Sequence, residues 1–214
     1  MDIFGEVGLH GVVPVIEIDD ASHALPLADA LAEGGLPVAE ITFRTPAARD
    51  AIAAVAAHRP DMLVGAGTVL TPAQVDAARQ AGARYGLAPG LNRAVLARAA
   101  EAGLPFAPGV MTPSEIEQAL EAGCGMVKFF PAMAAGGPAM LKAIAGPYAH
   151  TGIGFNPTGG VTLDALKDWL ALPNVRAVGG TWIASRADIA AERWEAIAEN
   201  ARAAVARAAR VRAA

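Results

Sequence analysis

Lys128 lies in the apolar run GMVKFFP, where a charged side chain needs an explanation. The chain has two other lysines, Lys142 in AMLKAIAG and Lys167 in LDALKDWL, and both runs have a helical pattern in which lysine usually faces solvent. Lys128 lies in a strand-like run, and desolvation there favours the uncharged amine. An uncharged lysine can attack a ketone, and the resulting iminium withdraws electrons from the neighbouring carbon–carbon bond. A structural ion pair is the competing interpretation, and Lys128 alone does not decide between them.

A second polar cluster lies in the run EITFRT, in which Glu40, Thr42 and Arg44 alternate with apolar residues. In an extended strand these three side chains share one face. The planar guanidinium of Arg44 suits a substrate carboxylate, and Glu40 could transfer protons directly or through one water. A Glu–Arg salt bridge closing the strand is the alternative, and it is favoured unless Lys128 lies nearby.

Two glycine pairs indicate an anion site. Gly159 and Gly160 follow Thr158 in PTGG, and Gly179 and Gly180 precede Thr181 in GGTW. Glycine lets backbone N–H groups approach an anion closely, and phosphate sites are often built from the loops after the last two strands of an eight-stranded barrel. A single glycine pair usually marks only a turn. Two glycine pairs after the last two predicted strands favour a phosphate-binding site.

The elements that must position these residues are short strands alternating with Ala-rich helices. Strands are predicted at Val12–Ile18, Val38–Thr42, Leu63–Ala66, Tyr85–Ala88, Pro105–Ala107, Met126–Phe130, Gly154–Asn156 and Val175–Val178. Helices are predicted at Ala21–Ala32, Pro46–His58, Pro72–Ala81, Arg93–Ala102, Pro113–Ala122 and Leu163–Leu172. Thr45, Thr71 and Thr112 each precede a proline, which is typical of a helix start.

The repeated strand–helix order predicts parallel strands and an α/β (β/α)8 barrel, with catalytic groups at the carboxyl ends of the strands. The main alternative is an open doubly wound sheet, although no G-x-G-x-x-G follows a strand. The 214 residues suit a single domain over 1–214, with a short N-terminal lead and a C-terminal covering helix from about Ala187 to Ala214.

Composition narrows the class of protein. Hydrophobic residues make up 54%, which excludes a disordered chain, and the net charge of −4 without a long basic run argues against nucleic-acid binding. No apolar run is long enough for a membrane span, and the N-terminus does not resemble a signal peptide. The single cysteine, Cys124, forbids an internal disulfide, and a cytoplasmic location is the simplest expectation.

Metal chemistry has little support in the sequence. The histidines His10, His23, His58 and His150 are scattered, and none forms an H-x-x-x-H pair. His23, His58 and His150 are expected on helices or loops away from the strand exits. Cys124 follows a helix-closing glycine and is expected to be packed rather than nucleophilic.

Taken together, these motifs resemble the KDPG/KHG aldolase family (2-keto-3-deoxy-6-phosphogluconate and 4-hydroxy-2-oxoglutarate aldolases), and the match runs nearly end to end. It rests on VVPVI, VAEITFRT, VGAGTVLTP, APGL, FAPGV-TPSE, VKFFPA, IAGP, PTGGV and VGGTW, in that order. The resemblance implies a class I aldolase, a carbon–carbon lyase that needs neither metal nor added cofactor and is commonly a homotrimer. Its substrate is a phosphorylated 2-keto acid, cleaved to pyruvate and glyceraldehyde 3-phosphate.

The resemblance also assigns roles. Lys128 would form the Schiff base, Glu40 would be the general acid/base, and Arg44 would bind the substrate carboxylate. The pyruvate end would be lined by Thr68, Pro89, Phe130 and Thr158. The phosphate would be held by Gly159, Gly160, Gly179, Gly180 and Thr181.

Two departures from the family pattern affect the substrate range. Met133 stands where many members have glutamate, and Thr181 stands where many have serine. Cleavage of 4-hydroxy-2-oxoglutarate, or of 2-keto-3-deoxy-6-phosphogalactonate, is therefore the nearest alternative. A metal-dependent aldolase or decarboxylase and a non-catalytic phosphometabolite-binding barrel are the alternatives from other classes.

Overall fold

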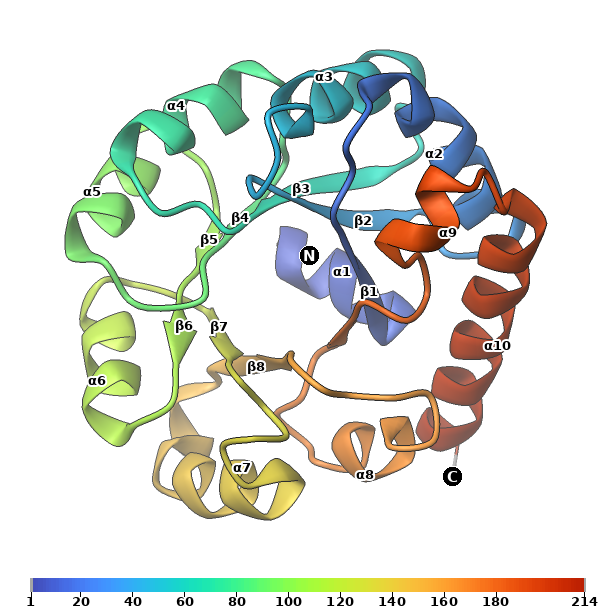
Figure 1. Ribbon diagram of the computed structural model, residues 1–214. Coiled ribbons are helices and arrows are strands. Elements are labelled where there is room, and N and C mark those ends of the chain that lie inside the picture. Colours follow the sequence, from blue (N-terminus) through green and yellow to red (C-terminus); the bar gives the residue numbers. More distant parts are fainter. Residues whose placement is uncertain (1, 214) are drawn as a thin grey trace.

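Parallel strands form the centre of the computed structural model, which describes residues 2–213, and helices surround them (Figure 1). The first two strands are rich in Val and Ile, and all residues of the first three strands are buried on both faces, as expected when helices cover a parallel sheet. The strands are β1 (Val12–Ile16), β2 (Val38–Thr42), β3 (Leu63–Gly67), β4 (Gly86–Leu87), β5 (Phe106–Ala107), β6 (Gly109–Val110), β7 (Met126–Phe129), β8 (Gly154–Pro157) and β9 (Val178–Gly180).

The sheet curls in the manner of a (β/α)8 barrel, but its ladder is not continuous. Six strands pair in the order β5-β4-β3-β2-β1-β9, and three pair in the order β6-β7-β8. Between β8 and β9 the described residues form only isolated bridges, Thr158 with Gly179 and Phe155 with Val175. The predicted last strand, Val175–Val178, is therefore misplaced: the regular strand begins at Val178 and runs to Gly180.

The other interruption lies within one extended stretch. Ala107 ends β5 and Gly109 begins β6, so Pro108 separates two strands that pair with opposite neighbours. Proline has no N–H to donate to a ladder, which accounts for the break. The Pro108 carbonyl still accepts a hydrogen bond of 2.8 Å from the Lys128 N–H, so β7 follows the same stretch.

Helices lie outside the strands, as the alternating pattern predicts (Figure 1). They are α1 (Ile3–His10), α2 (Ala24–Glu33), α3 (Ala48–His58), α4 (Pro72–Gln80), α5 (Arg93–Glu101), α6 (Pro113–Glu121), α7 (Gly137–Ala145), α8 (Leu166–Leu170), α9 (Arg186–Ala190) and α10 (Trp194–Arg212), with short 3₁₀ helices at Ala21–His23 and Gly146–Thr151. Lys142 and Lys167 lie on α7 and α8, as predicted.

The predicted helix starts are confirmed at two of three places. Thr71 and Thr112 form capping boxes with Gln74 and Glu115. Thr45 does not cap α3, which begins at Ala48, because its hydroxyl donates to the Ile18 carbonyl. The Thr45 hydroxyl therefore bonds to the loop that follows β1 instead of capping α3.

The N-terminal lead forms a helix of eight residues, α1, which lies behind the centre of the ring in Figure 1. Phe4 of α1 packs edge-on against Tyr85, which directly precedes β4, with ring centroids 6.1 Å apart. Helix α1 therefore covers the amino-terminal end of the ring. At the other end of the chain, α9 and α10 divide the predicted covering helix in two, and Ala214 lies outside the described residues.

No helix within residues 2–213 combines the length and the apolar character that a membrane crossing requires.

Candidate active site

Lys128 faces the interior of the ring. Its neighbour Phe129 points the other way and contacts Trp169 of the outer helix α8, with ring centroids 6.3 Å apart. Because side chains alternate along a strand, Lys128 must point inward. Its side chain is only 3% exposed.

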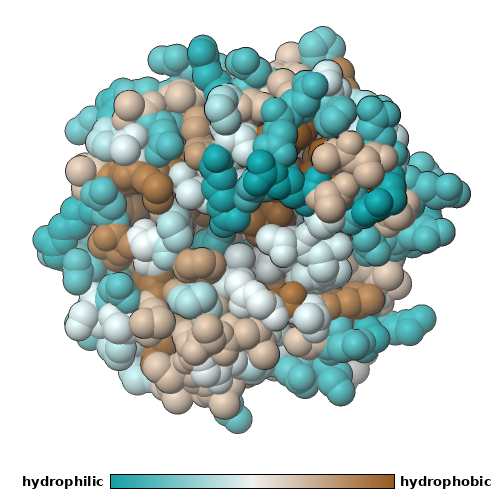
Figure 2. All heavy atoms as spheres, in the orientation of Figure 1, coloured by the Kyte–Doolittle hydropathy of each residue, from teal (hydrophilic) through white to brown (hydrophobic). Residues whose placement is uncertain are grey.

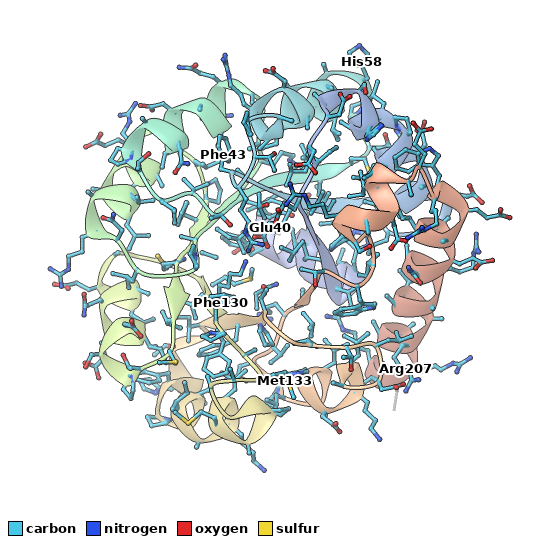
Figure 3. The ribbon with its side chains drawn as sticks, viewed as in Figure 1. Glu40, Phe43, His58, Phe130, Met133 and Arg207 are labelled. Atoms are coloured by element: carbon cyan, nitrogen blue, oxygen red, sulfur yellow. The ribbon has the colours of Figure 1, made fainter. Side chains whose placement is uncertain are left out.

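The buried partner of Lys128 is Glu40, which comes from β2 on another part of the ring. Lys128 Nζ donates to Glu40 Oε1 over 2.8 Å, and Glu40 is fully buried. Glu40 lies near the centre of the ring, and Phe130 lies towards β7 (Figure 3). Glu40 Oε2 has no hydrogen-bond partner in the part of the chain that the structure describes. The Glu40 carboxylate therefore binds the Lys128 amine through Oε1 and keeps Oε2 free to accept another hydrogen bond.

Two glycines of β3 make room beneath this pair. A Cβ on Gly67 would collide with Glu40, lying 2.7 Å from its Cγ, and a Cβ on Gly65 would lie 2.6 Å from Cδ2 of the Tyr85 ring. The Tyr85 hydroxyl donates to the Ala39 carbonyl over 3.0 Å. Burial, and then the charge of Glu40, raise the pKa of Tyr85 well above its ordinary value, so the phenol stays protonated beneath the carboxylate.

Gly67→Ala should therefore displace Glu40 while leaving Lys128 in place. Overpacking of this kind costs about 1–3 kcal/mol of stability, and a catalytic group misplaced by about 1 Å can lose about 10²-fold in rate. We expect kcat of the activity that the family resemblance implies to fall by about that factor. Gly125→Ala is the matched control, because a Cβ at Gly125 meets nothing within 4 Å and should leave kcat unchanged. A Gly67→Ala enzyme as active as the control would contradict the crowding argument.

Arg44 lies at the rim rather than in the interior, with 40% of its side chain exposed. Its Nε donates to Thr68 Oγ1 over 3.2 Å, and its Nη1 lies 3.5 Å from Glu17 Oε2. Glu17 also binds Arg186 over 2.6 Å, and Arg186 binds Asp19. The pKa of Asp19 is lowered, chiefly by its hydrogen bond from Arg186. Arg44 is thus held between two side chains and still faces the opening of the ring.

The alternative of a Glu40–Arg44 salt bridge does not occur in residues 2–213, where Glu40 pairs with Lys128 instead. Arg44 follows the end of β2 at Thr42, so the strict alternation of the strand no longer controls its direction. The Thr42 hydroxyl donates to the Ile16 carbonyl over 2.8 Å, which joins β2 to β1 below the rim.

Asn156 and Thr158 form a polar pair on β8 and its exit. Thr158 Oγ1 donates to Asn156 Oδ1 over 2.7 Å, and both residues are buried. Asn156 is in register with Lys128 on the neighbouring strand. Sequence reasoning does not single out Asn156, although a polar residue two positions before Thr158 in an apolar strand is the signal that could have identified it.

The two glycine pairs lie side by side, because Thr158 forms a bridge with Gly179. Gly159 and Gly160 have φ angles of 104° and 74°, which disfavour other residues. A Cβ on Gly179 would collide with the Thr158 side chain, and one on Gly180 would collide with the Trp182 ring. Thr181 is exposed next to them. Gly160 is exposed and Gly159 is half-buried, whereas Gly179 and Gly180 are buried, so the exposed backbone at this place belongs to the first loop and to Thr181.

The remaining predicted residues lie around the opening. Pro89 packs so closely against Gly109 that a Cβ there would collide with its carbonyl, and Phe130 packs against Gly159. Met133 lies beside Gly160 and is 43% exposed. In Figure 2, which colours residues by hydropathy, tan and pale residues cover the region of α7, and strongly hydrophilic residues gather above the centre of this face. Met133 therefore adds an apolar side chain beside the predicted phosphate loop.

The histidines lie apart from this cluster. His58 ends α3 on the outside of the molecule (Figure 3), where its Nδ1 lies 3.0 Å from the Ala54 carbonyl. His23 and His150 lie on the short 3₁₀ helices. No group of three His, Cys, Asp or Glu side chains in residues 2–213 has the arrangement of a metal site. Burial raises the pKa of the Cys124 thiol to about 11, so the thiol is protonated at neutral pH, consistent with a packed residue.

A buried lysine beside a carboxylate, inside parallel strands and below the rim that bears Arg44, is suited to Schiff-base chemistry on a keto acid. The family model for KDPG and KHG aldolase matches residues 6–200. The 2-dehydro-3-deoxy-phosphogluconate aldolase of Haemophilus influenzae is 50% identical over 186 residues, which cover 87% of each chain. The chain belongs to the KDPG and KHG aldolase family.

Other relatives agree with this assignment. The KHG/KDPG aldolase of Escherichia coli is 43% identical over 194 residues, covering 91% of this chain and 90% of the relative. A crystal structure of the Legionella pneumophila KDPG aldolase holds pyruvate captured at low pH as a covalent carbinolamine. That structure has a TM-score of 0.88 and 43% identity, and the match covers 94% of this chain and 97% of that one.

Proposed function

We propose that the chain is a class I aldolase that reversibly cleaves 2-keto-3-deoxy-6-phosphogluconate to pyruvate and glyceraldehyde 3-phosphate, with Lys128 as the covalent catalyst. The buried Lys128–Glu40 pair carries the proposal, because it places a desolvated amine beside a base at 2.8 Å. Family membership supports it, since the named relatives are aldolases and one of them forms a covalent adduct with pyruvate.

The mechanism follows from the two oxygens of Glu40. The Lys128 ammonium gives one proton to Glu40, and the free amine attacks the C2 ketone. Glu40 passes this proton, and then a second proton lost by the nitrogen, to the ketone oxygen. Water leaves, and the iminium between C2 and Nζ keeps the third proton. Glu40, through a water, then accepts the C4 hydroxyl proton while the C3–C4 electrons move into the iminium. Glyceraldehyde 3-phosphate leaves, the enamine is protonated at C3, and hydrolysis of the iminium frees pyruvate and Lys128.

Borohydride reduction in the presence of pyruvate tests this mechanism. We expect one stable adduct per chain, and peptide mapping should place it on Lys128. An adduct on Lys142 or Lys167 alone, or no adduct under conditions in which the enzyme is active, would contradict the assignment.

We further propose that Arg44 binds the substrate carboxylate and that Thr68, Pro89, Phe130 and Thr158 line the pyruvate end. Arg44 suits this role because its guanidinium is held by Thr68 and Glu17 yet remains 40% exposed at the rim. The phosphate is assigned to Gly159, Gly160, Gly179, Gly180 and Thr181. The adjacency of the two glycine loops supports this assignment.

Removing the substrate phosphate should therefore lower kcat/KM. Each charge-assisted hydrogen bond contributes about 1.5–3 kcal/mol, so the loss of even one should cost about 10- to 100-fold. Parallel assays with 2-keto-3-deoxy-6-phosphogluconate and its dephosphorylated analogue measure this ratio. Equal kcat/KM values would argue against a phosphate site at these loops.

Substrate alternatives use the same lysine. The E. coli relative is named for both KHG and KDPG, so 4-hydroxy-2-oxoglutarate is the second candidate, and 2-keto-3-deoxy-6-phosphogalactonate is a third. Comparing kcat/KM among the three distinguishes them. A metal-dependent aldolase would lose activity in EDTA and regain it with Mg²⁺, and a non-catalytic binding barrel would bind phosphorylated ligands without trapping pyruvate.

The proposal includes a single barrel domain over residues 1–214 in which the two sheets act as one (β/α)8 barrel. It also includes a homotrimer, which rests on the family resemblance, and a cytoplasmic location, for which the single cysteine is the only support. Light scattering of the purified protein tests the trimer, and cell fractionation tests the location.

A further inference from the structure

Asn156 carries an unused hydrogen-bond donor into the interior of the ring. It is fully buried, and its Nδ2 has no acceptor within residues 2–213. A buried amide without a partner is destabilising, so its presence in a strand of apolar neighbours indicates another use.

The direction of this donor is fixed by its neighbours. Asn156 is in register with Lys128 on the adjacent strand, and backbones of adjacent strands lie about 4.8 Å apart. In-register residues of parallel strands point to the same side, so the amide faces the interior with Lys128. Thr158 Oγ1 donates to Asn156 Oδ1 over 2.7 Å, which fixes the oxygen and leaves the NH₂ group free to donate.

We propose that Asn156 Nδ2 donates a hydrogen bond to the oxygen on C2 of the bound keto acid, which makes Asn156 a further catalytic residue. The inference rests on the proposed aldolase function. When Lys128 Nζ bonds to C2, the π electrons of the ketone move to oxygen, and a donor at that oxygen stabilises the developing charge. The protons that convert the oxygen to water come from Nζ by way of Glu40, so Asn156 keeps both of its own.

The same hydrogen bond gives Thr158 a defined role. Because its proton is engaged by Asn156 Oδ1, the Thr158 hydroxyl can only accept from the substrate. Asn156 and Thr158 therefore present one hydrogen-bond donor and one acceptor to the substrate. Both groups come from β8 and its exit, next to Lys128.

Asn156→Leu tests the proposal, because leucine has nearly the same shape and lacks both polar atoms. We expect the rate of borohydride-trapped adduct formation with pyruvate to fall by about 10²-fold, as for the loss of one oxyanion donor. The melting temperature should change little, since the variant removes an unpartnered buried donor but also removes the oxygen that accepts from Thr158. Trapping at the parent rate would overturn the proposal.

Two further variants keep the test decisive. Asn156→Asp retains the oxygen that accepts from Thr158 and loses the donor, so its trapping should be slowed even if the leucine variant folds poorly; parent-rate trapping would count against the donor. Thr158→Val supplies a double-mutant cycle. If Asn156→Leu has no further effect in the valine background, Asn156 acts only through Thr158 and the direct contact is wrong. Failure of the parent protein to trap pyruvate would instead refute the proposed aldolase function.

Discussion

Replacing Lys128 with methionine should abolish pyruvate trapping and reduce kcat/KM by at least about 10³-fold, since removal of a covalent catalyst leaves only binding and orientation. Methionine has a similar length and no amine. The Lys128 side chain is 3% exposed, so water cannot easily take the place of the lost amine.

This substitution also has a cost in stability that must be separated from the chemistry. It leaves Glu40, which is fully buried, without its ion-pair partner. Breaking a buried pair in this way destabilises a protein by about 3–5 kcal/mol. The double variant Lys128→Met/Glu40→Gln removes the uncompensated charge, so its melting temperature should recover most of the loss while its activity does not. If activity returned together with stability, Lys128 would be a structural residue.

Glu40→Gln is the second variant with a large expected effect. Glutamine keeps the shape of the side chain and can still accept a hydrogen bond from Lys128, but it cannot transfer protons. General acid–base catalysis typically contributes about 10²–10⁴-fold, so kcat should fall within that range. The adduct with pyruvate should still form, more slowly, because the nucleophile is intact.

Thr42→Val is the control for Glu40→Gln, since it removes another buried polar group of β2. Its hydroxyl donates only to the Ile16 carbonyl and lies outside the proposed proton route. Its effect should appear in the melting temperature rather than in kcat. A Glu40→Gln enzyme with the parent kcat, or a Thr42→Val enzyme that is equally impaired, would contradict the role assigned to Glu40.

Strand alternation predicts that Glu40, Thr42 and Arg44 share one face, but it does not say which face of a strand is the interior. The structure shows that Lys128 and Glu40 both point inward. Their contact could not be predicted from alternation alone, because the two residues are 88 positions apart and meet only when the sheet curls. Family resemblance supplied that link. The catalytic roles of these residues stay predictions until the variants are measured.

Where the sequence prediction differs from the structure, tertiary contacts explain the difference. Thr45 precedes a proline as Thr71 and Thr112 do, but its hydroxyl is used by the exit of β1. Asn156 carries a weak signal in the sequence, because a single polar residue in a strand does not reveal which of its atoms are satisfied. Arg44 lies beyond the end of β2, where periodicity no longer applies.

The position of α1 has a consequence for the order in which products leave. Because this helix covers the amino-terminal end of the ring, we expect substrate and products to pass at the carboxyl ends of the strands. In the proposed reaction the pyruvyl half stays attached to the buried lysine, and the aldehyde half lies between it and the opening. Glyceraldehyde 3-phosphate therefore departs first, because the pyruvyl half is still bonded to Lys128 when the C3–C4 bond has broken, and α1 leaves the aldehyde no exit at the amino-terminal end.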